Sequence, residues 1–430
     1  MGDADCTDLP KKIGPLRAGL HALGPGLITG AADDDPSGIA TYSQAGAQFG
    51  FNMLWTVVLT YPFMVGIQLV SARIGRVTGR GLAANIKRAY PPWLLYGIVL
   101  LLLVANTINI AADIAAMGEG LRLVLGHGSA HLYSLGFGFL CLTLQIFLPY
   151  RRYVSYLKWL TVGLLAYVAT VFAIKVPWGE VALRTFWPSL SWNNDSVTLI
   201  VAVFGTTISP YLFFWQASQE VEEIRASKTG LSLRKSPTDA SVQLNRIKTD
   251  TFIGMAFSNI VAFCIILTTA VTLGAHGVTD IQTSAQAAEA LRPIAGEFAF
   301  LLFALGIIGT GLLAIPVLAG SAAYAVTESF KWRNGLELKA LEAREFYAII
   351  SLATIGGMLL NFTPIDPIKA LFWCALINGV IAVPIMAVMM LLAREPKVMG
   401  SFTLSRRHVV IGWIGVTIML VAVVAMFATM

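Results

Sequence analysis

The feature that most constrains this chain is a run of charged and helix-breaking residues inside an apolar span, Ala31-Ala32-Asp33-Asp34-Asp35-Pro36-Ser37-Gly38. Apolar helical sequence flanks the run on both sides, over residues 16–29 and 39–49. Carboxylates inside a membrane helix are expensive, and they are kept where they face a cavity, an opposite charge or a bound cation. Pro36 and Gly38 interrupt the helix and free backbone carbonyls, which a membrane tolerates only inside protein or beside water. The run therefore predicts a cation site at a broken membrane helix.

The composition extends this interpretation to the whole chain. Hydrophobic residues make up 56% of it and charged residues only 13%, whereas soluble domains carry roughly 25% charge; the mean hydropathy is +0.72. This composition predicts an all-α polytopic membrane protein. The alternative for residues 31–38 is a cytoplasmic loop between two short helices. Such helices would be amphipathic, and the flanking sequence is not. The acidic start does not resemble a cleavable signal peptide. The four cysteines are scattered, which favours packing over a disulfide or zinc site.

Hydropathy over windows of about 19 residues predicts eleven transmembrane spans. They cover residues 18–48 (broken), 52–72, 92–125, 129–149, 153–176, 195–222 (broken), 247–274, 296–327, 345–361, 367–393 and 408–429.

The charges of the predicted loops alternate from one side of the membrane to the other. Of the 30 lysines and arginines, 25 fall on one side. The positive-inside rule therefore predicts a cytoplasmic N-terminus, an external C-terminus and insertion in the plasma membrane, the inner membrane if the chain is bacterial. The net charge of +6 follows from this topology, so it does not indicate a nucleic-acid partner. No phosphate-binding loop, zinc motif or nucleophile triad is evident, and we do not expect an enzyme.

The sixth span repeats the break of the first. It reads Val203-Phe204-Gly205-Thr206-Thr207-Ile208-Ser209-Pro210-Tyr211-Leu212, with a proline at mid-span after small and hydroxyl residues. The two breaks are five spans apart, an odd number, so the two halves run in opposite directions. Paired broken helices in inverted halves mark the substrate site of many secondary transporters. We therefore predict a tail over residues 1–17, inverted five-helix repeats over 18–176 and 195–393, and an eleventh helix over 408–430.

Several motifs of the first spans resemble the Nramp family of divalent metal transporters. They are Gly24-Pro25-Gly26, Asp35-Pro36-Ser37-Gly38, Gln44-Ala45-Gly46-Ala47-Gln48-Phe49-Gly50, Leu54-Trp55 and Arg76-Val77-Thr78-Gly79-Arg80. The match is specific over the first two spans and looser over the rest of the chain. The resemblance implies the LeuT-type fold, in which inverted five-helix repeats place broken helices 1 and 6 around the metal.

The resemblance also implies a set of metal ligands, from which this chain departs in part. Asp35 keeps the metal-binding aspartate of the family's Asp-Pro-Gly-Asn motif, but Gly38 stands where its asparagine is expected. Ser209 and Tyr211 replace the methionine and histidine of the family's Met-Pro-His motif. By position, Ala32 and Thr206 should offer backbone carbonyls, and Asp33 and Asp34 are candidates to replace the missing asparagine. Because hydroxyl oxygen is a harder ligand than thioether sulfur, we expect a hard cation, Mg²⁺ or Mn²⁺.

The groups that carry protons in the family are also altered. Asp113 matches an aspartate of the third span, whereas Ala116 falls on its glutamate partner and Glu119 lies one turn further along. Gln216 falls near a histidine position of the sixth span, and all five histidines of the chain lie near span ends or in loops. We therefore expect proton coupling to be weak or absent. Asn109 and Asn378 are the remaining pathway candidates, with interhelical hydrogen bonding as the alternative for both.

Together these observations predict a monomeric importer of a divalent cation, which is its substrate and not a resident cofactor, with the lipid bilayer as its other partner. A carrier of the same fold that has lost metal transport and moves another solute is the first alternative. A non-transporting sensor is the second. Asp33, Asp34 and Asp35 favour the metal, while three residues count against it, namely Gly38, Ser209 and Tyr211.

Overall fold

The computed structural model describes residues 29–30, 32–148, 163–189, 192–227, 230–362 and 366–429. The protein is helical, and no strand occurs in these ranges. Among the described residues, eight stretches are long and apolar enough to cross a membrane. One of them, Pro36–Thr78, joins the part of the first predicted span that follows the break to the whole of the second predicted span.

Helical residues occur within each of the eleven predicted spans, but the predicted tail over residues 1–17, residues 18–28 and 31 of the first span and residues 153–162 of the fifth span lie outside the described residues. The helices are α3 (Pro36–Phe49), α4 (Leu54–Thr78), α6 (Pro92–Leu125), α7 (Ala130–Phe147), α9 (Leu165–Ala173), α11 (Asn194–Thr207), α12 (Pro210–Ala226), α13 (Ala240–Thr272), α16 (Ala299–Phe330), α17 (Arg344–Leu360), α18 (Pro367–Arg394) and α20 (Arg406–Thr429). The predicted bounds of the third span agree with α6 at both ends.

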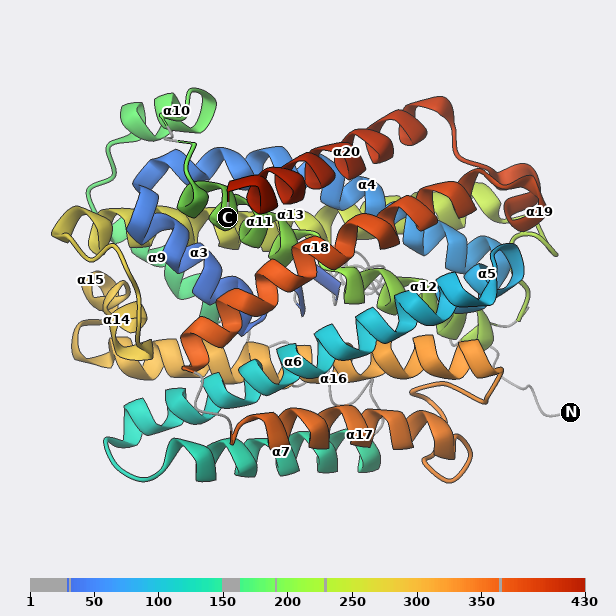
Figure 1. The fold of residues 1–430 in the computed structure, drawn as a ribbon, viewed down its shortest axis with the longest axis horizontal. Helices are drawn as coiled ribbons and strands as arrows, with labels where there is room; N and C mark the ends of the chain where they lie inside the picture. The colour runs from blue at the N-terminus through green and yellow to red at the C-terminus, as the bar shows by residue number, and fades with distance from the viewer. Residues whose placement is uncertain are drawn as a thin grey trace, which may run out of the picture.

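Shorter helices at the two ends of the molecule were absent from the hydropathy prediction, because they are amphipathic or too short for a 19-residue window. These are α5 (Leu82–Ala89), α10 (Trp178–Phe186), α14 (Ser284–Glu289), α15 (Arg292–Ala295) and α19 (Pro396–Met399). Figure 1 places α5 and α19 at one end of the molecule and α10, α14 and α15 at the other. By the charge count, the first of these ends is the predicted cytoplasmic one.

Both predicted helix breaks are present. Residues 32 and 33 are helical, Asp34 is in a bend, and Asp35 is extended before α3 begins at Pro36. In the sixth span, α11 ends at Thr207 and α12 begins at Pro210, with Ser209 extended between them. A proline at the first position of each second half fits a helix start, since its missing N–H would have no partner there.

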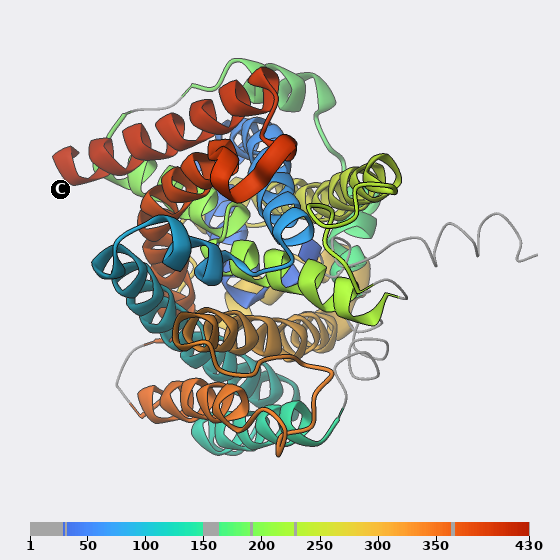
Figure 2. The same ribbon diagram turned by 90° about the vertical axis from the view of Figure 1, so that its right-hand side faces the viewer.

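The helices lie in layers on both sides of the broken spans. Helices α7 and α17 lie side by side at one face, and α6 and α16 form the next layer (Figures 1 and 2). The broken helices lie in the next layer together with α4, α13 and α18, and α20 covers the opposite face (Figures 1 and 2). This arrangement encloses both breaks, so their freed backbone groups lie in protein and not in lipid.

Small residues let the helices of the central layer approach closely. Gly205 of α11 faces Ala375 and Gly379 of α18, and a Cβ at Gly205 would overlap the Ala375 carbonyl oxygen. A Cβ at Gly75 of α4 would likewise overlap the backbone of Ala217 on α12. Such contacts are how membrane helices pack when no hydrophobic driving force acts between them. They also fix the position of α11, which carries half of the sixth-span break.

Gly205→Ala is therefore expected to destabilise the protein, because the new methyl meets backbone atoms that cannot move independently. Overpacking a rigid core costs about 1–3 kcal/mol, which we expect to appear as a lower melting temperature and a lower monodisperse yield in detergent. Gly97→Ala on α6 is the matched control, since a Cβ there meets no atom within 4 Å. An unchanged melting temperature for Gly205→Ala would contradict the close packing of α11 on α18.

Candidate cation site at the helix breaks

The centre of the candidate site is Asp35, which is 1% exposed. Its Oδ1 atom accepts hydrogen bonds from the Gly38 backbone N–H at 2.8 Å and from the Ser37 hydroxyl at 2.6 Å. This oxygen caps α3, and the cap orients the carboxylate. Its Oδ2 atom accepts from the Asn109 amide at 3.2 Å and from the Tyr211 hydroxyl at 3.4 Å. Asp35 thus joins the first span to the third span through Asn109 and to the sixth through Tyr211.

Tyr211 bridges the two helix breaks. Its hydroxyl lies 3.1 Å from the Ala32 carbonyl oxygen as well as 3.4 Å from Asp35 Oδ2. A phenol has one proton to donate and two lone pairs to offer. In this arrangement the proton lies toward the two oxygen atoms that the sequence predicts as cation ligands. A cation that binds there must turn the hydroxyl proton away, and the Tyr211 oxygen then becomes available as a ligand.

A chain of amides extends from Asp35 to two further predicted residues. The Asn109 amide also donates to Asp113 Oδ2 at 3.1 Å, and the Asn378 amide donates to Asn109 Oδ1 at 3.2 Å. All three side chains are buried. Asp113 Oδ1 has no hydrogen-bond partner among the described residues. The structure therefore brings Asn109, Asp113 and Asn378 together beside Asp35.

Asp33 and Asp34 turn away from Asp35 and toward α13. The Ser258 hydroxyl lies 2.7 Å from Asp33 Oδ2 and 3.0 Å from Asp34 Oδ1. The other oxygen of each carboxylate has no partner in the part of the chain that the structure describes. Accordingly, no group of three carboxylate, thiol or imidazole side chains that could hold a metal ion is found there. The three aspartates form one capping carboxylate and one separate pair, instead of a single cluster.

The hydroxyl groups of Ser209 and Thr207 in the sixth span donate hydrogen bonds to backbone carbonyls of the same span. Ser209 donates to the carbonyls of Thr206, at 2.9 Å, and Gly205, at 3.1 Å. The Thr206 carbonyl keeps a second lone pair for another partner. A Cβ at Gly38 would lie 3.1 Å from the Thr206 hydroxyl and 3.3 Å from the Tyr42 ring. A larger residue at position 38 would therefore press on the Thr206 hydroxyl and the Tyr42 ring, so glycine suits the close approach of α3 to α11.

Two predicted residues lie away from Asp35. Glu119 forms an ion pair with Arg122 one turn along α6, and both side chains are partly exposed. The structure thus does not bring Glu119 into the cluster around Asp113. Gln216 is fully buried and accepts a 2.6 Å hydrogen bond from Thr29, so it joins α12 to the first half of the first span.

The sequence prediction missed Ser258 and Tyr42, which are both buried beside the aspartates. The available signal for Ser258 was the polar pair Ser258-Asn259 within an otherwise apolar seventh span. Tyr42 carried no such signal, because a tyrosine in an apolar helix is ordinarily read as packing.

The site gathers four buried carboxyl groups. Asp33, Asp34, Asp35 and Asp113 are at most 1% exposed, and no ion pair to any of them occurs among the described residues. The carbonyl-bearing ends of α11 and of the first half-helix lie beside them, which adds partial negative charge. Burying a charge without a partner costs several kcal/mol, so each of these carboxyl groups is either neutral or balanced by a cation.

A cavity lies at the predicted external end of the molecule. A cavity of ≈ 320 Å³ is lined by residues of α3, α11 and α18, among them Ala40, Gln44, Asp195 and Phe372. It reaches α3 five residues beyond Asp35. On the other side of the break, the buried aromatic side chains of Phe213, Phe214 and Trp215 follow along α12.

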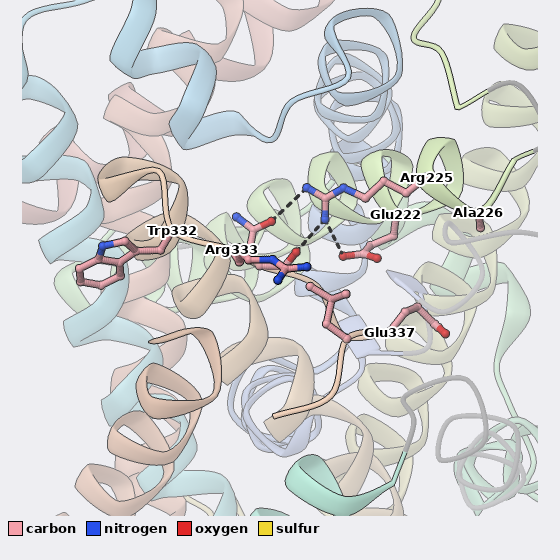
Figure 3. A pocket seen from close by; sticks show the side chains of 8 residues that line it. Glu222, Arg225, Ala226, Trp332, Arg333 and Glu337 are labelled. Carbon is pink, nitrogen blue, oxygen red and sulfur yellow. Dashed lines mark hydrogen bonds and ion pairs between the residues drawn. The ribbon is translucent and has the colours of Figure 1, made fainter. Parts of the chain in front are cut away.

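Ion pairs beyond these aromatic residues hold the predicted cytoplasmic end together. Glu220 of α12 pairs with Arg246 of α13 at 2.7 Å and lies 4.0 Å from Arg76 of α4. Figure 3 shows Arg225, at the end of α12, reaching toward Glu222 and the loop after α16, where it donates to the Asn334 carbonyl at 2.7 Å. A cavity of ≈ 520 Å³ lies beside these groups. These contacts link α12 to α4, to α13 and to the loop after α16.

Comparison with known proteins agrees with the fold. Residues 26–429 match the family described as natural resistance-associated macrophage protein-like, Nramp. The divalent metal cation transporter MntH of Yersinia enterocolitica is 30% identical over 323 residues, 73% of each chain. MntH of Klebsiella pneumoniae strain 342 is 29% identical over 302 residues, 68% of each chain.

Solved structures share the architecture at low sequence identity. The manganese transporter of Eremococcus coleocola, in complex with an aromatic bis-isothiourea substituted compound, superposes with a TM-score of 0.72 at 16% identity, covering 97% of this chain and 88% of that one. Mhp1, a nucleobase-cation-symport-1 family transporter, gives a TM-score of 0.55 at 15% identity over 95% and 92% of the two chains. The predicted LeuT-type fold is confirmed, and the family match over nearly the whole sequence shows that this chain belongs to the Nramp family.

Proposed function

We propose that the protein carries a divalent metal cation across the membrane and binds it between the two helix breaks. The observation that carries this proposal is Asp35, a buried carboxylate without a counter-cation among the described residues, located where the first, third and sixth spans meet. The relatives named above are metal cation transporters by name, which supports the same substrate class. Both breaks come from one chain, so the proposed carrier works as a monomer.

The proposed ligands are all oxygen atoms. They are the carboxylate of Asp35, the Tyr211 hydroxyl and the carbonyls of Ala32 and Thr206. Asn109 is not a proposed ligand, and its amide donates a hydrogen bond to the Asp35 carboxylate. Oxygen ligands suit Mg²⁺ and Mn²⁺, and they provide no preference for softer metals. Ser209 directs its hydroxyl to backbone carbonyls, where a thioether would have offered sulfur. The preferred substrate is therefore a hard divalent ion.

The proposed direction of transport is inward, from the end with the 320 Å³ cavity to the end where Glu220 pairs with Arg246. The charge count supports a cytoplasmic location for the latter end, for the N-terminus and for most basic residues. In this orientation the C-terminus is external, in the plasma membrane or the bacterial inner membrane.

One observation favours the alternative, a carrier of another solute. The Tyr211 hydroxyl already provides a hydrogen-bond partner for the Ala32 carbonyl and for the Asp35 carboxylate. These two oxygen atoms therefore have a partner without a metal ion. The two functions differ in a simple measurement: only the metal carrier binds a divalent cation at the breaks.

Competition between metals in proteoliposomes tests the proposal. We expect Mg²⁺ to inhibit Mn²⁺ uptake at a concentration within about tenfold of that of Mn²⁺ itself, since the proposed ligands are all oxygens. The variant Ser209→Met adds a thioether beside Thr206, and we expect it to raise the Cd²⁺ preference over Mg²⁺ by at least about tenfold. Ser37→Met is not a suitable comparison, because Ser37 contacts Asp35 directly; Thr198→Met in the outer cavity serves as the control.

Two results would count against this function in different ways. Uptake of Cd²⁺ that does not respond to a large excess of Mg²⁺ would overturn the preference for hard ions while keeping metal transport. Absence of binding for every divalent cation, measured by calorimetry on folded wild-type protein, would favour the carrier of another solute.

A further inference from the structure

A second polar cavity lies at the end of the molecule that carries α5 and α19. Its volume is ≈ 540 Å³, within the ~300–1,000 Å³ typical of small-molecule sites. Three segments that are distant in sequence contribute its walls: Thr78, Arg80, Asn85, Arg88, Ala89 and Tyr90; Ser232, Arg234 and Lys235; and Glu395, Lys397 and Val398. It is separate from the candidate cation site, which is buried in the layer of the broken helices.

Local hydrogen bonds build the walls of this cavity. Gly79 ends α4 with a positive φ of 66°, which a residue with a side chain rarely adopts. The Asn85 amide then holds the turn by donating to the carbonyls of Gly81, at 2.8 Å, and Arg80, at 3.0 Å. The turn therefore presents Arg80 on a fixed backbone.

The other two segments dock on the end of α4 and on each other. The backbone N–H groups of Leu233 and Arg234 donate to the carbonyls of Arg76 and Val77. The Arg234 guanidinium donates to the carbonyls of Lys397, at 2.8 Å, and Val398, at 3.1 Å. These contacts bring the loop after α12 and the loop after α18 to the same cavity.

The cavity concentrates positive charge. Five basic side chains line it, Arg80, Arg88, Arg234, Lys235 and Lys397, against the single carboxylate of Glu395. All five are exposed, and no ion pair to any of them occurs in the described part of the chain. The phenol of Tyr90 adds a hydrogen-bond donor to the wall, and burial and the nearby Glu395 carboxylate raise its pKa further.

Basic residues on the cytoplasmic side of a membrane protein are ordinarily solvated charges that set its topology. Such charges need no cavity and no defined position relative to one another. Here three arginines and two lysines from three segments face one concavity whose walls are held by the hydrogen bonds above. Arginine presents a planar fork that binds two phosphate oxygens at once, and lysine adds a point charge.

We propose that this cavity binds a phosphate-bearing anion, with Arg80, Arg88 and Lys235 as its principal contacts. The ligand chemistry is a phosphate group, which either a soluble polyphosphate compound or the headgroup of an anionic lipid supplies. The bound anion would bridge the end of α4 to the loops after α12 and α18. It would thereby tie the helix that carries half of the sixth-span break to its neighbours.

Binding to purified full-length protein tests the proposal. Sodium tripolyphosphate is the soluble probe, measured by calorimetry in a neutral detergent. Nanodiscs of phosphatidylcholine with and without phosphatidylglycerol supply the lipid probe, and the anionic lipid that co-purifies is quantified by mass spectrometry. The test variant carries Arg80→Gln, Arg88→Gln and Lys235→Gln; no side-chain hydrogen bond of these three residues is found among the described residues, and Arg234 is left intact because it holds the loops together.

The matched control removes three exposed charges at the same end of the molecule, by Arg333→Gln, Lys339→Gln and Arg344→Gln. We expect the wild type and the control to bind one probe equally, and the test variant to bind it at least about tenfold more weakly. Loss confined to tripolyphosphate identifies a soluble phosphate compound, and loss confined to phosphatidylglycerol identifies a lipid headgroup. Equal binding by the test variant and the wild type, or equal loss in the control, would overturn the proposal.

Discussion

Asp35→Ala is expected to abolish cation binding and transport while the protein still folds. The alanine removes the one carboxylate at which the first, third and sixth spans meet. It also removes the side-chain cap of α3, whose loss costs about 1 kcal/mol, so a small drop in melting temperature accompanies the loss of function. The measurement is Mn²⁺ uptake into proteoliposomes, together with calorimetry on the same preparation.

A companion variant separates the charge from the cap. Asp35→Asn keeps an oxygen that can accept from the Gly38 N–H and removes the negative charge, so it should melt like the wild type and still fail to bind metal. Binding to the folded state raises stability by RT ln(1 + [L]/Kd), about 2.7 kcal/mol at a hundredfold excess over Kd. We therefore expect a metal-dependent rise in melting temperature for the wild type and none for Asp35→Asn.

Asp34→Asn is the matched control for position, because Asp34 is equally buried but bonds to Ser258 on α13. It should weaken binding less than Asp35→Asn does. If transport survives Asp35→Ala unchanged, the cation does not bind at the first-span break. If Asp34→Asn abolishes binding and Asp35→Asn does not, the Ser258 pair is the site instead.

Much of the helical framework was predictable, because span length and hydropathy are set by the bilayer. The bounds of α6 agree with the predicted 92–125 at both ends, and both breaks lie at the predicted prolines. The start of α13 at Ala240 was missed by seven residues. Residues 240–246 are polar and helical, and a hydropathy window cannot distinguish a polar helix extension from a loop.

The content of the site was less predictable than its position. The sequence indicates that three consecutive aspartates occupy a break, but backbone dihedral angles there decide where each side chain points. Because Asp35 is extended and Asp33 is still helical, their carboxylates diverge toward α6 and α13. The same limitation concealed Ser258, whose role depends on a helix more than 200 residues away in the sequence.

Cation uptake is expected to be largely uncoupled from protons. A proton-coupled carrier needs a titratable group near the substrate that gains and loses a proton in each cycle. The four described histidines, His127, His131, His276 and His408, are exposed, and His21 lies outside the described residues. Glu119 is engaged with Arg122. Asp113 is the remaining candidate outside the aspartate run, and it is linked to Asp35 through Asn109.

Membrane potential alone can drive such uptake. Each elementary charge gains about 2.3 kcal/mol per 100 mV, so a divalent ion gains about 4.6 kcal/mol per 100 mV without a co-transported proton. The measurement is internal pH during cation uptake into liposomes held at a fixed negative potential. We expect uptake that increases with potential, and no acidification beyond that of protein-free liposomes, both in the wild type and in Asp113→Asn.

The opposite outcome has a specific signature. If protons accompany the metal, the liposome interior acidifies in proportion to uptake, and a pH gradient alone drives accumulation without a potential. Should that acidification disappear in Asp113→Asn while metal binding remains, Asp113 would be the proton carrier, and the chain from Asp35 through Asn109 would be its link to the metal. Should acidification persist in Asp113→Asn, the proton would travel through another group, for which the paired carboxylates on Ser258 are the next candidates because each keeps one oxygen free of hydrogen bonds within the described residues.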